Sequence, residues 1–364
     1  MEERVYNFSA GPSQMPLEVL EQIQKELLCL PGAGASVMEI SHRSKPFDAV
    51  IDGAEEAIRR LMNIPDDYAV LFLQGGATMQ FSEVCMNLAH QGETMAFIKS
   101  GQFSKKAMDE GARWGNAVCV ASSEDEKFTY IPKLDPANVP KDAKLLHFTG
   151  NNTVYGTTFW ELPKVPEGCG ARLVGDWSSA ILGIDIDVKA HDLIYAGAQK
   201  NIGPAGLTVV ILKKDILERD IDPVVPIMLR YKVAADARSM YNTPPCFAIY
   251  AAGLVFKWIE RQGGVAEMER RNREKASLLD DFIDNSKIYK CPVRPGDRSI
   301  MNVVFRLPSE ELTAAFVKQA ADNGLISLKG HRAAGGCRAS LYNGMPLEGV
   351  KKLTEVMKEF ERHV

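Results

Sequence analysis

A single lysine, Lys200, lies between two short apolar runs in the segment IYAGAQKNIGPAGLTVVILKK, residues 194–214. Gly203, Pro204 and Gly206 follow it, so the chain around Lys200 is predicted to form a rigid, narrow turn. A lysine that is held in such a turn and partly removed from water loses its proton more readily, and the neutral amine can then form a Schiff base. The alternative is an ordinary surface lysine.

Asp176 is a second residue whose position suggests chemistry. It ends the apolar run RLVGD, residues 172–176, and a carboxylate at the end of a buried strand needs a positively charged partner. The protonated pyridine nitrogen of pyridoxal phosphate would be such a partner, and the same cofactor needs a lysine for its aldehyde. Asp176 and Lys200 together therefore point to this cofactor. Alternatively, Asp176 could cap a helix that starts at WSSA.

Two glycine-containing segments could bind the phosphate of such a cofactor. QGGATMQF, residues 74–81, lies between a predicted strand and a predicted helix, and backbone N–H groups at the start of a helix bind anions. NFSAGP, residues 7–12, has a similar composition. Either segment could instead only turn the chain, so each is a weak indication by itself.

Several cations indicate an anionic substrate. The dipeptide His-Arg occurs as His42-Arg43 in SHRSK and as His331-Arg332 in KGHRAAGG, and Arg338 lies in the strand-like segment GGCRASLYN. Either dipeptide alone could be an ordinary exposed loop. Taken together, these side chains suit a substrate that carries an α-carboxylate and a doubly charged phosphate.

The elements that position these residues are predicted from seven short apolar runs between about residues 68 and 214. Helical patterns such as QFSEVCMNLAHQ separate them, which predicts an α/β fold with an open sheet covered on both faces. Ligands collect at the carboxyl ends of such strands, where Thr153, Asp176 and Lys200 follow three of the runs. The runs are YAVLFLQGG, TMAFIKSG, AVCVAS, KLLHFTGN, ARLVGDWSS, DLIYAGAQK and GLTVVILKK.

The C-terminal part of the chain has a different character. A helical pattern, FAIYAAGLVFKWIERQ, closes at Gly263 and Gly264, and a charged helix follows. Beyond it, two helices alternate with the predicted strands KIYKCPV, SIMNVVFRL, LISLKGH and GCRASLYN, which is typical of a small α+β domain. We expect an N-terminal arm (1–15), a large domain (16–262) and a small domain (263–364).

Composition excludes several classes of protein. The chain of 364 residues has a net charge of -4 and no basic stripe, which argues against binding of nucleic acid. Its seven cysteines include no CxxC pair, so neither a disulfide framework nor a metal site is suggested. The sequence contains no signal peptide and no apolar run of roughly 20 residues. We therefore expect a soluble, cytoplasmic protein.

In this order along the chain, FSAGP, VMEISHRSK, DWSS, IYAGAQKNIGPAGL, NTPP, GLVFKWI, KGHR and GGCRASLYN resemble the phosphoserine aminotransferase family of class V aminotransferases. The resemblance runs nearly end to end, and the motif around Lys200 is its most specific part. It implies fold type I of the pyridoxal-phosphate enzymes, with a seven-stranded sheet, a small C-terminal domain and a homodimer whose active sites are shared. It also implies ping-pong transamination between L-glutamate and 3-phosphooxypyruvate, which gives O-phosphoserine and 2-oxoglutarate.

The resemblance also implies roles for individual residues. Lys200 would hold the cofactor, Asp176 would pair with its ring nitrogen, and Thr153 would bond its phenolic oxygen. The residues implied for the cofactor phosphate are Ala77, Thr78 and Gln199, with Asn242 and Thr243 reaching over from the other subunit. The residues implied for the substrate are Arg338 and Ser9 at the α-carboxylate, and His42, Arg43, His331 and Arg332 at the distal phosphate or carboxylate.

The chain departs from the family pattern at two positions. Phe103 stands where most members stack a tryptophan on the cofactor ring, so stacking is kept but the indole N–H is lost and weaker cofactor binding is expected. Thr78 stands where some members have an arginine, so one contact to the distal anion is expected to be missing.

Other functions remain open on the sequence alone. A cysteine desulfurase, an alanine–glyoxylate type aminotransferase or a kynureninase-like lyase would share the scaffold, although Cys246 and Cys337 are interpreted as packed thiols rather than as a desulfurase nucleophile. A nicotinamide-dependent oxidoreductase would need GxGxxG, which QGGATMQ does not fit. A binding or structural protein would need neither Lys200 nor Asp176. A phosphorylated keto acid of vitamin B6 synthesis is open as a second substrate.

Overall fold

The computed structural model describes residues 4–364 and is built around one seven-stranded sheet. Its order is β2-β10-β9-β8-β5-β3-β4, and β10 alone runs antiparallel to its neighbours. All seven predicted runs form these strands, which confirms the α/β, mostly parallel sheet. The strands are β2 (Tyr68–Leu73), β3 (Thr94–Lys99), β4 (Asn116–Ser122), β5 (Leu145–Thr149), β8 (Arg172–Asp176), β9 (Leu193–Gly197) and β10 (Thr208–Lys213).

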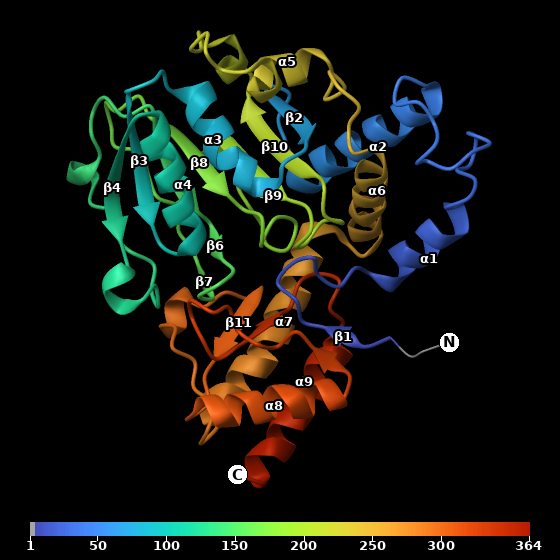
Figure 1. The fold of residues 1–364 in the computed structure, drawn as a ribbon, viewed down its shortest axis with the longest axis vertical. Coiled ribbons are helices and arrows are strands. Elements are labelled where there is room, and N and C mark those ends of the chain that lie inside the picture. The colour runs from blue at the N-terminus through green and yellow to red at the C-terminus, as the bar shows by residue number, and fades with distance from the viewer. Residues whose placement is uncertain (1–3) are drawn as a thin grey trace.

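Helices cover both faces of this sheet (Figure 1). Val70 and Phe72 of β2 belong to the core shared with α2 (Lys45–Met62) and α6 (Cys246–Arg261). The alternate residues of the same strand, Ala69 and Leu71, belong to a second core with α3 (Gly76–Leu88) and α4 (Gln102–Trp114). Burial on both faces explains why the strands read as continuous apolar runs. Two further helices, α1 (Leu17–Glu26) and α5 (Tyr231–Asp236), complete this part of the chain.

The sheet brings the loops that carry the candidate residues to one edge. The strands β9, β8 and β5 are neighbours and parallel, so the segments that follow Gly197, Asp176 and Thr149 leave the sheet side by side. A short hairpin after β5, formed by β6 (Asn151–Asn152) and β7 (Thr157–Thr158), places Thr153 at the same edge. This is the edge at which open α/β sheets bind ligands.

The C-terminal part forms a separate lobe with its own apolar core, at the bottom of Figure 1. The predicted helices are confirmed. The N-terminal strand β1 (Tyr6–Asn7) pairs with β12 (Leu325–Ile326), and Phe8 packs into this second core, so the N-terminal arm is joined to the C-terminal lobe. The other elements of the lobe are α7 (Gly264–Asn285), β11 (Asn302–Phe305), α8 (Glu310–Asp322), β13 (Cys337–Ser340) and α9 (Leu347–Arg362).

One predicted strand was wrong. KIYKCPV, residues 287–293, forms only an isolated bridge in which Lys290 and Arg306 exchange two backbone hydrogen bonds of 3.0 and 2.9 Å. Pro292, two residues further on, has no N–H group, so it cannot supply the next donor of a ladder.

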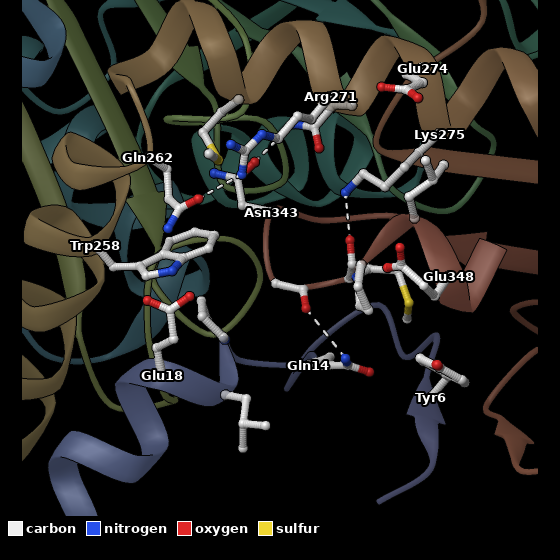
Figure 2. Close-up of a pocket in the computed structure, with 18 of the residues that line it drawn as sticks. Tyr6, Gln14, Glu18, Trp258, Gln262, Arg271, Glu274, Lys275, Asn343 and Glu348 are labelled. Atoms are coloured by element: carbon white, nitrogen blue, oxygen red, sulfur yellow. Dashed lines mark hydrogen bonds between the residues drawn. The ribbon is translucent and has the colours of Figure 1, made fainter. Parts of the chain in front are cut away.

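The N-terminal arm and α7 hold the segment that follows β13 around a cavity of about 600 Å³ (Figure 2). Gln14 Nε2 donates to the carbonyl of Gly344 at 3.3 Å. Lys275, buried on α7, donates to the carbonyls of Leu341, Tyr342 and Met345 at 2.7, 2.8 and 2.9 Å. Because this segment directly continues the strand that carries Arg338, these bonds fix the end of that strand.

Within residues 4–364, no helix is long and apolar enough to cross a membrane. The same residues contain no group of three or more His, Cys, Asp or Glu side chains that could hold a metal ion.

Candidate active site

Lys200 and Thr153 are in direct contact at the carboxyl edge of the sheet. Lys200 Nζ donates a hydrogen bond to Thr153 Oγ1 at 2.9 Å, and Thr153 is buried. Burial lowers the pKa of Lys200, Arg338 lowers it further, and Asp176 opposes both. A lysine whose proton is more easily lost at a strand end is suited to nucleophilic and proton-transfer chemistry. The structure therefore joins two of the residues that the sequence placed at separate strand ends.

Asp176 is the last residue of β8 and is only 4% exposed. Its Oδ1 accepts hydrogen bonds from the backbone N–H of Ser178 at 3.0 Å and from the Ser178 hydroxyl at 2.6 Å. Burial raises the pKa of Asp176, and the positive charge of Lys200 and the bonds from Ser178 counteract this rise. A turn, not a helix, follows Asp176. The alternative in which Asp176 caps a helix is therefore wrong, and its side chain caps this turn instead.

Ser178 is a functional residue that the sequence reasoning missed. Its hydroxyl also accepts a hydrogen bond from the N–H of Gly197 at 3.0 Å, so it links the ends of β8 and β9. The spacing Asp-x-Ser is a signal for this kind of side-chain-capped turn and could have revealed it.

The surroundings of Lys200 fit the aromatic ring and the phosphate of pyridoxal phosphate. In the described part of the chain, Oδ2 of Asp176 accepts no hydrogen bond, which leaves one oxygen of a buried carboxylate for a protonated ring nitrogen. Phe103, in the first turn of α4, lies with its ring centroid 4.8 Å from Lys200 Nζ, so it can stack on a ring bound at this lysine.

The beginning of α3 can hold the phosphate. Gly75 and Gly76 have φ values of +86° and +66°, and the first turn of the helix, with Ala77 and Thr78, contains no acidic residue. Free N–H groups without a nearby carboxylate make a suitable anion site. Gln74 Nε2 donates to the carbonyl of Thr243 at 2.9 Å, so the segment with Asn242 and Thr243 lies near this loop of the same chain. The side chains of Asn242 and Thr243 are exposed.

The N-terminal segment NFSAGPS packs directly against Lys200. The backbone N–H of Ser13 donates to the carbonyl of Gln199 at 3.0 Å, and the Ser13 hydroxyl donates to the carbonyl of Lys200. Gly11 has φ +142°, and a Cβ atom there would lie 3.1 Å from Lys200 Cγ. The sequence left the role of this segment open, and in the structure its glycine fits both the positive φ and the close approach to Lys200.

Arg338 lies on β13, and its guanidinium group has few hydrogen-bond partners among the described residues. Nη1 is 3.4 Å from the carbonyl of Thr153, a long hydrogen bond, and the buried Nε has no partner among residues 4–364. Burial lowers the pKa of Arg338. Ser9 lies nearby. The carbonyl of Phe8, before it, accepts a hydrogen bond from the backbone N–H of Ser340, and the carbonyl of Ala10, after it, accepts one from the hydroxyl of Tyr342. An arginine in this state is suited to bind a carboxylate.

His331 lies near Arg338 and is followed in the chain by Arg332, whereas His42 and Arg43 do not join the site within one chain. Burial lowers the pKa of His331, and the charges of Arg338 and Arg332 lower it further. His42 and Arg43 belong to the loop between α1 and α2, and their side chains form no hydrogen bond or ion pair with the other described residues of the site.

Cys337 and Cys246 do not have the properties of a desulfurase nucleophile. Burial raises the pKa of Cys337 to about 12 and also raises the pKa of Cys246, so both thiols stay protonated near neutral pH. All seven cysteines are free.

Comparisons with known proteins agree with this geometry. A family model described as aminotransferase class V matches residues 5–353. The phosphoserine aminotransferase of Geobacillus kaustophilus (strain HTA426) is 51% identical over 361 residues, which cover 99% of each chain. Its counterpart in Bacillus cereus (strain ATCC 10987 / NRS 248) is 51% identical over 359 residues, again with 99% of each chain covered.

Solved structures give the same result. Phosphoserine aminotransferase from Bacillus circulans subsp. alkalophilus superposes with a TM-score of 0.95 at 42% identity, covering 100% of this chain and 99% of that one. Phosphoserine aminotransferase from Trichomonas vaginalis, solved with pyridoxal phosphate bound, gives a TM-score of 0.92 at 37% identity and covers 98% of this chain and 100% of that one.

Proposed function

Because this chain belongs to the phosphoserine aminotransferases of aminotransferase class V, we propose that it exchanges the amino group of L-glutamate with 3-phosphooxypyruvate. The products are 2-oxoglutarate and O-phospho-L-serine, and the reaction belongs to serine biosynthesis. The enzyme uses pyridoxal phosphate. The observation that carries the assignment of its site is the contact of Lys200 with Thr153, beside buried Asp176 and uncommitted Arg338.

When bound, pyridoxal phosphate supplies an aldehyde that condenses with amines and a protonated ring that stores the electrons left when Cα loses its proton. Lys200 would anchor the cofactor, and its free amine would take up the proton from the Cα atom of the amino acid. Asp176 would keep the ring nitrogen protonated, and Ser178 holds Asp176 in place. Phe103 would cover the ring, and the start of α3 would hold the phosphate together with Gln199.

The substrate is oriented by its two anionic ends. Arg338, next to Thr153, binds the α-carboxylate that both amino acids share. This leaves the distal group pointing toward His331 and Arg332 on the loop of the C-terminal lobe. One cationic region thereby accepts a phosphate in one half-reaction and a carboxylate in the other.

We propose that the enzyme is a homodimer whose partner completes each site, with Asn242 and Thr243 contacting the cofactor phosphate and His42 and Arg43 the distal group. Exposed apolar side chains next to Asn242 support this. Met79, Ile227, Met228 and Tyr241 are 40 to 50% exposed and line one surface hollow of about 290 Å³ that also includes Asn242. Clustered exposed apolar groups of this kind are typical of subunit interfaces.

We also propose the division into an arm (1–15), a large domain (16–262) and a small domain (263–364), and a cytoplasmic location. The separate apolar cores and the end of α6 just before Gly263 support the boundary between the two domains. Seven free cysteines suit a reducing compartment.

The function is tested by supplying the purified enzyme with L-glutamate and an acceptor, which is 3-phosphooxypyruvate, pyruvate or glyoxylate, and measuring the 2-oxoglutarate that forms. We expect fast turnover with 3-phosphooxypyruvate and much slower turnover with pyruvate or glyoxylate, because the cationic region has no partner in these small acceptors. A preference for glyoxylate would indicate an alanine–glyoxylate type aminotransferase instead.

A further inference from the structure

The first turns of α4 present two residues to the site. Phe103 and Lys106 are three positions apart and therefore share a face of the helix. Lys200 Nζ lies 4.8 Å from the centroid of the Phe103 ring, and Lys106 Nζ lies 5.8 Å from the same centroid. The ammonium group of Lys106 is thus adjacent to the aromatic ring that borders Lys200.

Lys106 is a cation without an anionic partner among the described residues. Its side chain is exposed and forms no hydrogen bond or ion pair with any residue that the structure describes. The neighbouring Lys105 differs, because its Nζ is 3.5 Å from a carboxylate oxygen of Glu124. Lys99 also pairs with Glu124, so two lysines share this acid. Glu124 forms no ion pair with Lys106.

Lys106 also lies near the loop of the C-terminal lobe that carries His331. Burial lowers the pKa of His331, the nearby charges of Arg338, Arg332 and Lys106 lower it further, and no carboxylate counteracts them. Two elements, α4 and the loop that follows Gly330, therefore carry positive groups in the same region. This is the region left for the distal end of a substrate whose α-carboxylate is at Arg338 and whose amino group is at Lys200.

We propose that Lys106 binds the distal phosphate of the phosphorylated substrate and favours it over the side-chain carboxylate of glutamate. This inference rests on the function proposed above. A phosphate monoester carries close to two negative charges near neutral pH, whereas the carboxylate carries one, so an added cation attracts the phosphate more strongly. Lys106 acts as a flexible point charge, and such a side chain can follow two distal groups of different size.

The test compares Lys106→Gln with the matched control Lys105→Gln, in the cofactor-loaded enzyme. For Lys106→Gln we expect kcat/KM for O-phospho-L-serine to fall roughly five- to tenfold, and kcat/KM for L-glutamate to fall less than about threefold. Lys105→Gln should change neither by more than about twofold. Lys106→Arg should restore the preference for the phosphorylated substrate.

A binding measurement gives a readout that does not depend on turnover. Calorimetric titration with inorganic phosphate should show a dissociation constant roughly five- to tenfold weaker in Lys106→Gln than in the wild type, and the difference should shrink at high salt. Equal losses for both amino acids, or unchanged phosphate binding, would overturn the role of Lys106 while leaving the function intact. A wild-type enzyme that does not react with O-phospho-L-serine would overturn the proposed function, and the inference with it.

Discussion

Ser178 donates both its backbone N–H and its hydroxyl to the same oxygen of Asp176, at 3.0 and 2.6 Å. The same hydroxyl accepts the N–H of Gly197, at the end of the strand that leads to Lys200. The acid and the lysine are therefore held relative to one another by one serine. Because Ser178 acts through Asp176, it is a positioning residue.

Replacing Asp176 and replacing Ser178, which holds it, should lower kcat by different amounts. In Asp176→Asn the amide oxygen can still accept both bonds from Ser178, but the charge is lost, so kcat should fall roughly 10²- to 10³-fold. Ser178→Ala keeps the charge and should lower kcat about tenfold, the value of one charge-assisted hydrogen bond of about 1.5 kcal/mol. Rapid-mixing absorbance measurements with glutamate give both rates.

The pH dependence of the cofactor absorption separates these roles from simple loss of structure. It should shift in both variants, since Asp176 sets the protonation of the bound ring. A wild-type rate in Asp176→Asn would contradict the pairing of this carboxylate with the ring nitrogen.

Gly11→Ala should impair catalysis through Lys200. The new Cβ would lie 3.1 Å from Lys200 Cγ, so that side chain must move by a few tenths of an ångström, and kcat should fall about tenfold, as expected for a small misplacement of a reacting group. Gly34→Ala is the matched control, because Gly34 also has a positive φ of +74° but has nothing within 4 Å of the added Cβ. Urea unfolding should show a loss of at least about 1 kcal/mol in each, because alanine is strained at a positive φ. Equal kcat values in the two variants would refute the contact argument.

Mixed dimers should reveal shared active sites. Neither Lys200→Ala nor the double variant Asn242→Ala/Thr243→Ala should be active alone. After subunit exchange, a mixture of the two should recover up to about a quarter of wild-type activity, because each heterodimer contains one intact site. A mixture of Lys200→Ala with Asp176→Ala should recover none, since both residues serve the same chain's site. No recovery in the first mixture would contradict the contribution of the partner.

Glu83 should make stability depend on pH. Burial raises its pKa to about 7, although a hydrogen bond from Gln80 lowers it, whereas the unfolded value is 4.5. The folded protein therefore keeps a proton that the unfolded chain releases between pH 4.5 and 7, and the free energy of unfolding should fall as pH rises through this window, by up to about 3 kcal/mol.

Glu83→Gln should remove this part of the pH dependence, while the exposed Glu355→Gln should not. Urea unfolding of the three proteins at pH 5 and at pH 8 measures it. An identical change in wild type and Glu83→Gln between these pH values would show that Glu83 does not titrate in this window.

The main fold and the central residues could be predicted because both follow from local patterns. Strands buried on two faces are continuously apolar, and Thr153, Asp176 and Lys200 each follow such a strand at the edge where parallel sheets bind ligands. The strand predicted in KIYKCPV was wrong because its ladder lacks a donor at Pro292.

The remaining site residues depend on contacts between distant segments. Gly11 matters because the N-terminal arm crosses Lys200, and no local pattern encodes that approach. Lys106 resembles Lys105 in the sequence, and only the structure distinguishes them, because Lys105 pairs with Glu124 whereas Lys106 lies over the Phe103 ring. The roles of His42 and Asn242 rest on the family resemblance and stay predictions, since they require a second subunit.

The most direct test of the account is the visible absorption spectrum of the purified, cofactor-loaded protein before and after addition of L-glutamate, with Lys200→Ala and the exposed Lys214→Ala as controls. We predict a yellow band that fades when glutamate is added and returns with 3-phosphooxypyruvate, in the wild type and in Lys214→Ala. Lys200→Ala should still bind the cofactor but respond at least about 10³-fold more slowly. A yellow band that glutamate does not change, or an equally fast response without Lys200, would contradict the account.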